Sequence, residues 1–175
     1  MLNQLLKKNR ICIYFICLVF MSFGLISCKE DNKVEPVEKK AIVGTFKWSE
    51  WQEKAGWASY DAADYIPDDS VMSELKAVNK DNISYILFSA SWCPDCMKEM
   101  PQLMKIFKLM DLDLETITIY GLTYKEKTEP TGTYLKYDIK RVPTLVVLRD
   151  GEEIGRIVEY PVESLEKDLL KILSL

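Results

Sequence analysis

The sequence contains no histidine, and it carries no excess of positive charge. Without histidine, the common ligand sets of zinc enzymes, the Cys–His nucleophile pair and a histidine general base are excluded. The net charge is −4, which gives no sign of a nucleic-acid binder. Hydrophobic residues make up 48% of the 175 positions and charged residues 29%, so we expect an ordinary globular domain of common size.

Cysteine is scarce as well, with five in the chain. Cys12, Cys17 and Cys28 lie near the N-terminus, whereas Cys93 and Cys96 form a CxxC pair. A tetrahedral zinc site needs four ligands, commonly two such pairs, and no second pair is present. The pair is therefore either an inert bridge or a redox site, and a bridge that closes so short a loop hardly constrains the unfolded chain.

The N-terminus predicts a targeting segment, residues 1–27. A basic stretch without acids is followed by an apolar run over residues 11–26, the order found in secretory signals. The run is also close to the length of a short membrane span. "LISC" at 25–28 resembles the lipobox of bacterial lipoproteins, with Cys28 as the lipidated first residue of the mature chain. Such a lipid would anchor the protein to a membrane.

Residues 28–44 are expected to be a charged, flexible tether. Its start, "KED", resembles a signal that exports some Gram-negative lipoproteins to the outer surface. We expect a lipoprotein of the cell envelope that faces the periplasm from the outer membrane, with the cell surface as the alternative.

Residues 45–175 are expected to form the folded domain. "SEWQ" at 49–52 has the spacing of a capping box, which predicts a short helix ending near Gly56. Trp48, Trp51 and Trp57 are interpreted as core residues, or alternatively as a hydrophobic rim for a partner. A second helix should begin at Asp68 or Asp69.

The CxxC pair follows a predicted buried strand over residues 83–89 and opens a predicted helix. Cys93 would then lie at the helix N-terminus, where free N–H groups and the helix dipole stabilise a thiolate. Cys96, one turn further on, should be less exposed. This arrangement suits an attacking thiol at Cys93 and a resolving thiol at Cys96. Pro101 should kink the helix.

The second half predicts a strand over 114–121, a short helix near 132–139 and two strands joined at Asp150–Gly151. A final amphipathic helix is expected over residues 161–173, with Val162 among the residues of its apolar face.

The chain resembles the thioredoxin family over roughly residues 71–173. The matching features are "WCPDC" at 92–96, Pro101, and "VPT" at 142–144 before a hairpin and a terminal helix. The resemblance implies an α/β thioredoxin fold, a central mixed sheet flanked by helices. It also implies a cis Pro143 beside the cysteines and a Val142 that offers its backbone to a substrate strand.

Trp92 and Tyr160 are further candidates for substrate contact, and Asp95 for an influence on the Cys93 thiolate. Leu87 occupies the position where thioredoxins carry a buried aspartate, so the proton acceptor for Cys96 must come from elsewhere. Glu99 is the candidate, as in the membrane-anchored reductases of cytochrome c maturation; the alternative is an ordinary solvated helix residue. Those reductases carry an insert between the CxxC motif and the cis-proline. The interval of 50 residues from Cys93 to Pro143 is too short for such an insert and is nearer to that of a plain thioredoxin.

These features predict a thiol–disulfide oxidoreductase that reduces protein disulfides through a redox-active Cys93–Cys96 disulfide, without a bound cofactor. The resemblance implies disulfide-containing proteins as substrates and a membrane thiol carrier as electron donor. A disulfide oxidase or isomerase and a client-binding module without turnover are the alternatives. A copper chaperone of this fold would usually need histidine.

Overall fold

The computed structural model describes residues 41–175. The expected signal segment, Cys28 and the tether up to residue 40 lie outside the described residues. None of the helices within residues 41–175 combines the length and apolar character needed to cross a bilayer.

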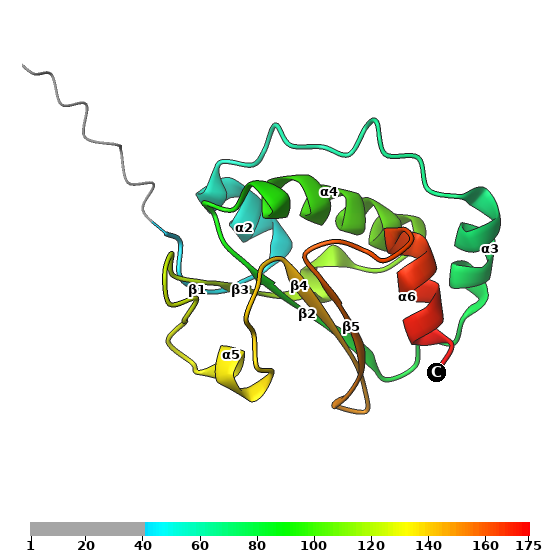
Figure 1. The fold of residues 1–175 in the computed structure, drawn as a ribbon. Helices are drawn as coiled ribbons and strands as arrows, with labels where there is room; N and C mark the ends of the chain where they lie inside the picture. Colours follow the sequence, from blue (N-terminus) through cyan, green and yellow to red (C-terminus); the bar gives the residue numbers. More distant parts are fainter. Residues whose placement is uncertain (1–40) are drawn as a thin grey trace, which may run out of the picture. The chain divides into compact units, whose positions relative to one another are not determined.

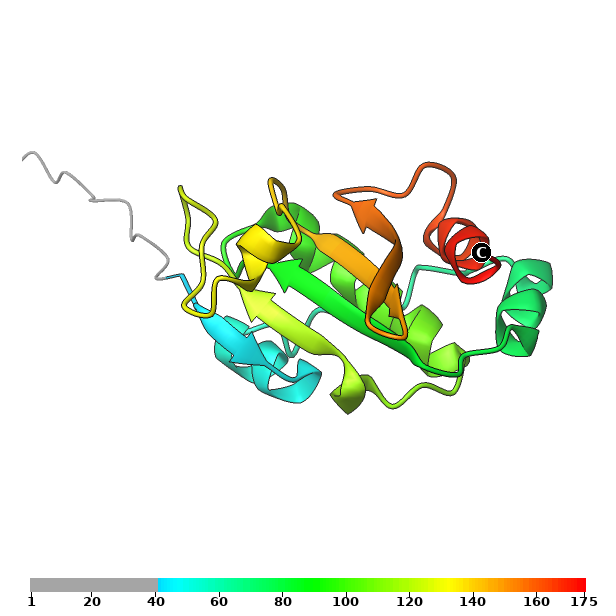
Figure 2. The ribbon, with the colours of Figure 1, turned by 90° about the horizontal axis from the view of Figure 1, so that it is seen from below.

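A five-stranded mixed sheet organises the domain (Figures 1 and 2). The elements in chain order are β1 (Gly44–Phe46), α2 (Trp48–Ala55), α3 (Asp69–Ala77), β2 (Ile83–Ser89), α4 (Pro94–Leu109), a 3₁₀ helix (Leu114–Thr116), β3 (Thr118–Gly121), α5 (Thr133–Lys136), β4 (Thr144–Arg149), β5 (Glu152–Val158) and α6 (Leu165–Leu173). The strand order is β1-β3-β2-β4-β5, in which β2 and β3 are parallel and the other pairs antiparallel. Figure 1 shows α2, α4 and α6 over one face of the sheet and α5 beneath the other. The predicted order of elements from residue 83 onward is confirmed.

The strand register brings distant segments to one end of the sheet. Ser89 at the end of β2 lies opposite Gly121 at the end of β3. Thr144 at the start of β4 lies opposite Phe88 in β2 and Val158 in β5. The segments that follow β2, β3 and β5 therefore meet the segment that precedes β4. The CxxC pair and Pro143 belong to these segments.

The tryptophans of the first helix belong to the core. Trp48, Trp51 and Trp57 are all buried, and the rings of Trp51 and Trp57 meet edge to face at 5.5 Å. The prediction of core packing is confirmed, and a hydrophobic rim made by these three side chains is excluded.

The predicted capping box is wrong. The residue that caps α2 is Lys47, and its side chain makes no capping hydrogen bond. Ser49 instead donates its N–H and its hydroxyl to Glu115, at 3.2 and 3.1 Å. A carboxylate from the 3₁₀ helix thus supplies the acceptor that a local cap would have provided. By contrast, Asp68 caps α3 as predicted, accepting from Ser70 and Val71.

Two predicted boundaries also differ. The final helix begins at Leu165 rather than residue 161, because the Asp168 carboxylate accepts the backbone N–H groups of Val162 and Glu163 and holds them outside the helix. Val162 is consequently 91% exposed and does not belong to the apolar face. The strand predicted from residue 114 begins at Thr118, after the 3₁₀ turn. α4 runs continuously through Pro101.

Candidate active site

Cys93 is the N-cap residue of α4, as the sequence predicted. Its Sγ accepts a hydrogen bond from the backbone N–H of Cys96 at 3.2 Å. Pro94 takes the first helical position, where its missing N–H costs nothing. Cys93 thus lies among the free N–H groups at the positive end of a 16-residue helix.

Cys96 is less exposed than Cys93, as predicted, but both side chains are buried. The Cys93 side chain is 4% exposed, and the Cys96 side chain is fully buried. The covering group is the loop before β4, because the Cys93 thiol donates to the Val142 carbonyl at 3.4 Å. The Val142 backbone therefore lies directly against the Cys93 sulfur.

The two thiols differ in acidity. A hydrogen bond from the Cys96 thiol, supported by backbone N–H groups, lowers the pKa of Cys93, against opposing effects of burial and of the Asp95 charge. Burial, with the neighbouring Cys93, raises the pKa of Cys96 well above that of a free thiol. Cys93 is therefore the thiol that ionises first, and Cys96 stays protonated beside it.

Ser89 is a site residue that the sequence reasoning missed. It is fully buried at the end of β2, and its hydroxyl donates to the Met100 sulfur at 2.8 Å. A hydrogen bond with Ser89 also opposes the rise in the pKa of Cys96. The signal available in the sequence was a polar residue ending an otherwise apolar strand directly before the motif.

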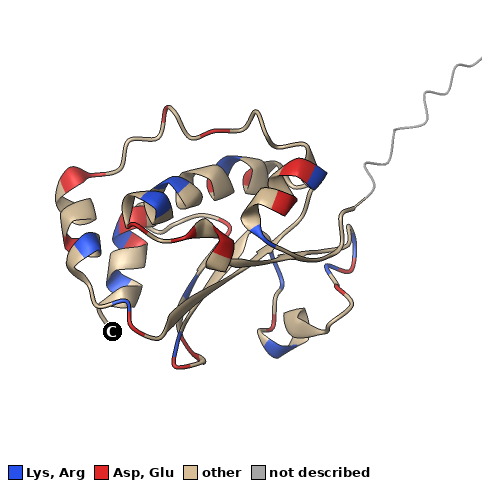
Figure 3. Cartoon of the chain, turned by 180° about the vertical axis from the view of Figure 1, so that it is seen from behind, with Lys and Arg blue, Asp and Glu red and all other residues tan. Residues whose placement is uncertain are grey.

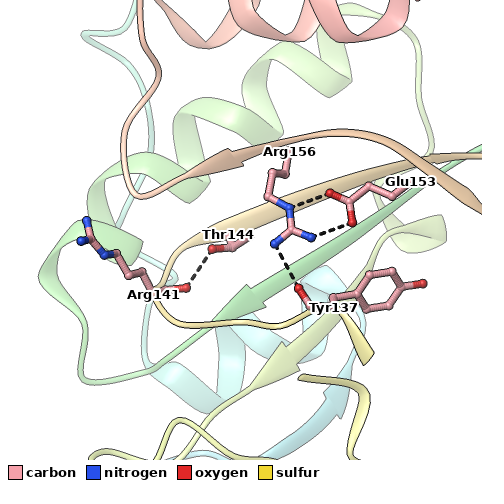
Figure 4. Close-up of polar contacts among 5 residues, drawn as sticks. All are labelled: Tyr137, Arg141, Thr144, Glu153 and Arg156. Atoms are coloured by element: carbon pink, nitrogen blue, oxygen red, sulfur yellow. Dashed lines mark hydrogen bonds and ion pairs between the residues drawn. The ribbon is translucent and has the colours of Figure 1, made fainter. Parts of the chain in front are cut away.

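The Val142–Pro143 peptide bond is cis, as the resemblance implied. Figure 4 shows how the loop carrying it is held at both ends. Arg156, paired with Glu153, donates to the Tyr137 carbonyl at 3.0 Å, and the Thr144 hydroxyl donates to the Arg141 carbonyl at 2.8 Å.

Aromatic side chains flank the cysteine pair on two sides. Trp92 lies edge to face against Tyr124, with ring centroids 4.9 Å apart, and its indole N–H donates to the Leu122 carbonyl at 3.4 Å. Tyr160 follows β5, is half-exposed, and its hydroxyl interacts with the Asp95 carboxylate, which raises the pKa of Tyr160. Trp92, Asp95 and Tyr160 are thus brought to the cysteine end of the sheet.

Glu99 is buried rather than solvated. It is 6% exposed, and its carboxylate pairs with Lys98 at 2.9 Å. It lines a small cavity of about 20 Å³ together with Leu87 and Pro143, and Cys96 is not part of that lining. Leu87 itself is buried at the position where a thioredoxin aspartate was expected.

Within residues 41–175, no three acidic, cysteine or histidine side chains gather in a way that could hold a metal ion.

The sequence model of a thioredoxin family matches residues 52–169. The chain belongs to the thioredoxin family. Rice (Oryza sativa subsp. japonica) thioredoxin H2-1 is 33% identical over 91 residues, covering 52% of this chain and 61% of the rice protein. Chlamydia pneumoniae thioredoxin is 31% identical over 71 residues, covering 41% of this chain and 63% of the Chlamydia protein. These alignments span less than two thirds of either thioredoxin relative. The solved thioredoxin of Fasciola hepatica aligns at 19% identity over 61% of this chain and 88% of its own, with a TM-score of 0.39.

Proposed function

We propose that this protein is a thiol–disulfide oxidoreductase of the cell envelope that reduces protein disulfides. The observation that carries the proposal is the acidity difference within the motif: Cys93 caps a helix and has a lowered pKa, while the buried Cys96 has a raised one. A thiolate is the reactive form, so this arrangement assigns attack to Cys93 and resolution to Cys96.

The reaction consists of two thiol exchanges. The Cys93 thiolate attacks one sulfur of the substrate disulfide, the substrate S–S bond breaks, and one substrate thiolate leaves with a proton from solvent. Cys96 then loses its proton and attacks the Cys93 sulfur, which releases the second substrate thiol. The products are a reduced substrate and a Cys93–Cys96 disulfide. A membrane thiol carrier would return two electrons to that disulfide.

The Val142 backbone supports a polypeptide as the substrate. Its carbonyl lies 3.4 Å from the Cys93 sulfur. An extended chain that pairs with Val142 would therefore place a cystine against the nucleophile, by the same hydrogen bonding that adds a strand to a sheet edge.

Glu99 is the proposed proton acceptor for Cys96 in the resolving step. Leu87 offers no carboxylate, whereas Glu99 is buried on the same helix, three residues after Cys96.

Reduction of insulin by dithiothreitol tests the proposal. Wild type should accelerate the precipitation of insulin chains, and Cys93→Ser should abolish the acceleration. Cys96→Ser should accumulate mixed disulfides with insulin that a non-reducing gel resolves. Wild type alkylated at its thiols is the control for activity that does not come from the pair. A wild type that binds insulin without acceleration would instead support a client-binding module. Turnover by Cys93→Ser would overturn the assigned roles.

A further inference from the structure

A segment that the mechanism does not use crosses the outer side of α4. Residues 58–67, here called the strap, connect α2 to α3 (Figure 1). The Lys105 ammonium, from the middle of α4, donates to the carbonyl oxygens of Ala62 at 2.8 Å and Tyr65 at 2.7 Å. These charge-assisted bonds fix the strap against the helix.

The aromatic residues of the strap are held in place as well. The Tyr65 hydroxyl donates to Glu166, a buried carboxylate of α6. The ring of Tyr60 lies edge to face against Trp57, with centroids 6.4 Å apart. Because the backbone and both rings are fixed, the surface that they form exists before any ligand binds.

A groove of about 460 Å³ lies between the strap and the first turns of α4. The residues that matter for its chemistry are Tyr60, Asp61, Asp64 and Tyr65 from the strap, with Pro94 and Met97 from α4. Pro94 directly follows Cys93 in the sequence, so the groove begins one residue from the nucleophile. A polypeptide whose cystine reaches Cys93 would have a neighbouring side chain within range of this groove.

The side chains that line the groove carry a formal charge of −1, from Asp61 and Asp64 against Lys98. Asp61 and Asp64 are exposed, and neither takes part in an ion pair within residues 41–175. The cation that also lines the groove, Lys98, is paired with Glu99 at 2.9 Å. Figure 3 shows acidic positions along the strap where it passes over α4. Two carboxylates beside two tyrosine rings form a surface that attracts a cationic side chain through Coulomb and cation–π interactions.

We propose that this groove receives a lysine or arginine side chain next to the reacting cystine, so that the protein selects basic polypeptides as substrates. The inference rests on the proposed reductase function and adds a substrate class to it. The attraction acts on the encounter and on the mixed-disulfide complex, and it changes no bond-making step.

Chromogenic peptides give a direct test. Each of three peptides carries one cysteine that is joined by a disulfide to 5-thio-2-nitrobenzoate. The cysteine is flanked by two arginines in the first peptide, two glutamines in the second and two glutamates in the third. Cys93 attacks the peptide sulfur, the coloured thiolate leaves, and Cys96 then releases the peptide thiol. The second-order rate constant for the arginine peptide should exceed that for the glutamate peptide by roughly tenfold at low salt, the lower end of electrostatic steering. The ratio should fall in 1 M salt, where the Debye length is about 3 Å.

A matched pair of variants locates the effect. Asp61→Asn with Asp64→Asn should reduce the arginine-to-glutamate ratio to about threefold or less. Asp150→Asn with Glu152→Gln removes the same charge at the β4–β5 turn, at the far end of the sheet from Cys93, and should keep the wild-type ratio. Circular dichroism confirms that each variant is folded.

The outcomes separate the inference from the function. If no peptide releases the chromophore, the proposed reductase function fails. If all three react at equal rates, or if the two double variants lower the ratio equally, the function stands and the groove is not the selector. A ratio that falls only in the Asp61/Asp64 variant supports the proposal.

Discussion

At the scale of single residues, the acidity of Cys93 depends on groups that the motif itself supplies. The hydrogen bond from the Cys96 thiol is the largest favourable contribution to its lowered pKa, and the Asp95 charge opposes it. Since only the thiolate reacts, these neighbours set the pH range in which the protein can act.

Replacing Cys96 tests the first of these contributions. Cys96→Ala removes the side-chain donor and should raise the pKa of Cys93, whereas Cys96→Ser keeps a donor and should raise it less. The rate of iodoacetamide alkylation, measured from pH 5 to pH 10, follows the thiolate fraction and gives both values. In the alanine variant the alkylation rate should rise at higher pH than in the serine variant. Identical profiles would show that the backbone N–H groups alone stabilise the thiolate.

Asp95 should keep the protein reducing. A negative charge beside Cys93 disfavours its thiolate, and an unusually stable reduced form is what makes a disulfide oxidising. We expect a reduction potential nearer to that of thioredoxin, about −270 mV, than to that of a strong oxidant, about −120 mV. Asp95→His should raise the potential, and Asp95→Asn is the control that removes the charge alone. Equilibration with glutathione measures the reduction potentials of wild type and of both variants. A wild-type value above about −180 mV would favour an oxidase or isomerase.

At the scale of elements, β2 and α4 pack through the buried Tyr85. Tyr85 is 5% exposed, its ring lies 4.6 Å from that of Phe107, and no hydrogen bond from its hydroxyl is found within residues 41–175. Burial raises its pKa to about 12. An unpaired buried hydroxyl costs free energy that an apolar ring would not.

Tyr85→Phe should therefore increase the free energy of unfolding by roughly 1 kcal/mol at pH 7. The folded-state pKa exceeds the unfolded value of about 10, so the unfolded chain releases its proton first and stability falls as pH rises from about 10 to 12. The variant should lose less stability than wild type over that range. Urea unfolding at pH 7 and pH 10.5 measures both effects. The half-exposed Tyr124 provides the control Tyr124→Phe, and an equal change there would refute the explanation.

The contact between β3 and the first two elements depends on Gly121. A Cβ at this position would lie 2.3 Å from the Ile42 carbonyl oxygen and 2.6 Å from the Trp51 ring. Both atoms belong to packed structure, and Trp51 is fully buried.

Gly121→Ala should consequently lower the free energy of unfolding by about 1–3 kcal/mol, as overpacking does elsewhere. Chemical denaturation followed by tryptophan fluorescence measures the loss. Thr45→Ala, at an exposed position of β1, is the control and should change stability by less than about 0.5 kcal/mol. If Gly121→Ala leaves the free energy of unfolding unchanged, β1 moves to make room for the methyl group without loss of stability.

At the scale of the whole molecule, the proposed location depends on Cys28, which lies outside the described residues. Cys28→Ala should abolish metabolic labelling with palmitate and either release the protein from membranes or block its maturation, because the proposed acyl chains on Cys28 would be the anchor. Cys12→Ala, within the expected signal, is the matched control and should keep the label. Labelling that persists without Cys28 would remove the lipoprotein proposal.

Signals carried by neighbouring residues predicted much of the fold. The apolar run of β2 and the Asp150–Gly151 turn gave elements close to those observed, and Cys93 capped α4 as expected. The start of α2 was wrong because the acceptor for Ser49, Glu115, lies 66 residues away in the chain. The start of α6 was missed although its cap, Ser164, is local. A boundary follows from sequence only when its cap lies within a few residues.

The sequence by itself determined the chemistry: two thiols one helical turn apart behind a buried strand, with a proline at position 143. Spacing along the chain encodes these features, since strand, cap and helix form among near neighbours. Only the tertiary structure decided how accessible the thiols are and how strongly burial raises the pKa of Cys96. Val142, 49 residues after Cys93, covers its sulfur, and burial raises the pKa of Cys96 and so separates it from that of Cys93. The strap lies beside the motif because Lys105 reaches carbonyl groups about 40 residues earlier in the chain. Packing sets such long-range contacts through shape and burial across the whole core, and no local stretch of sequence specifies them.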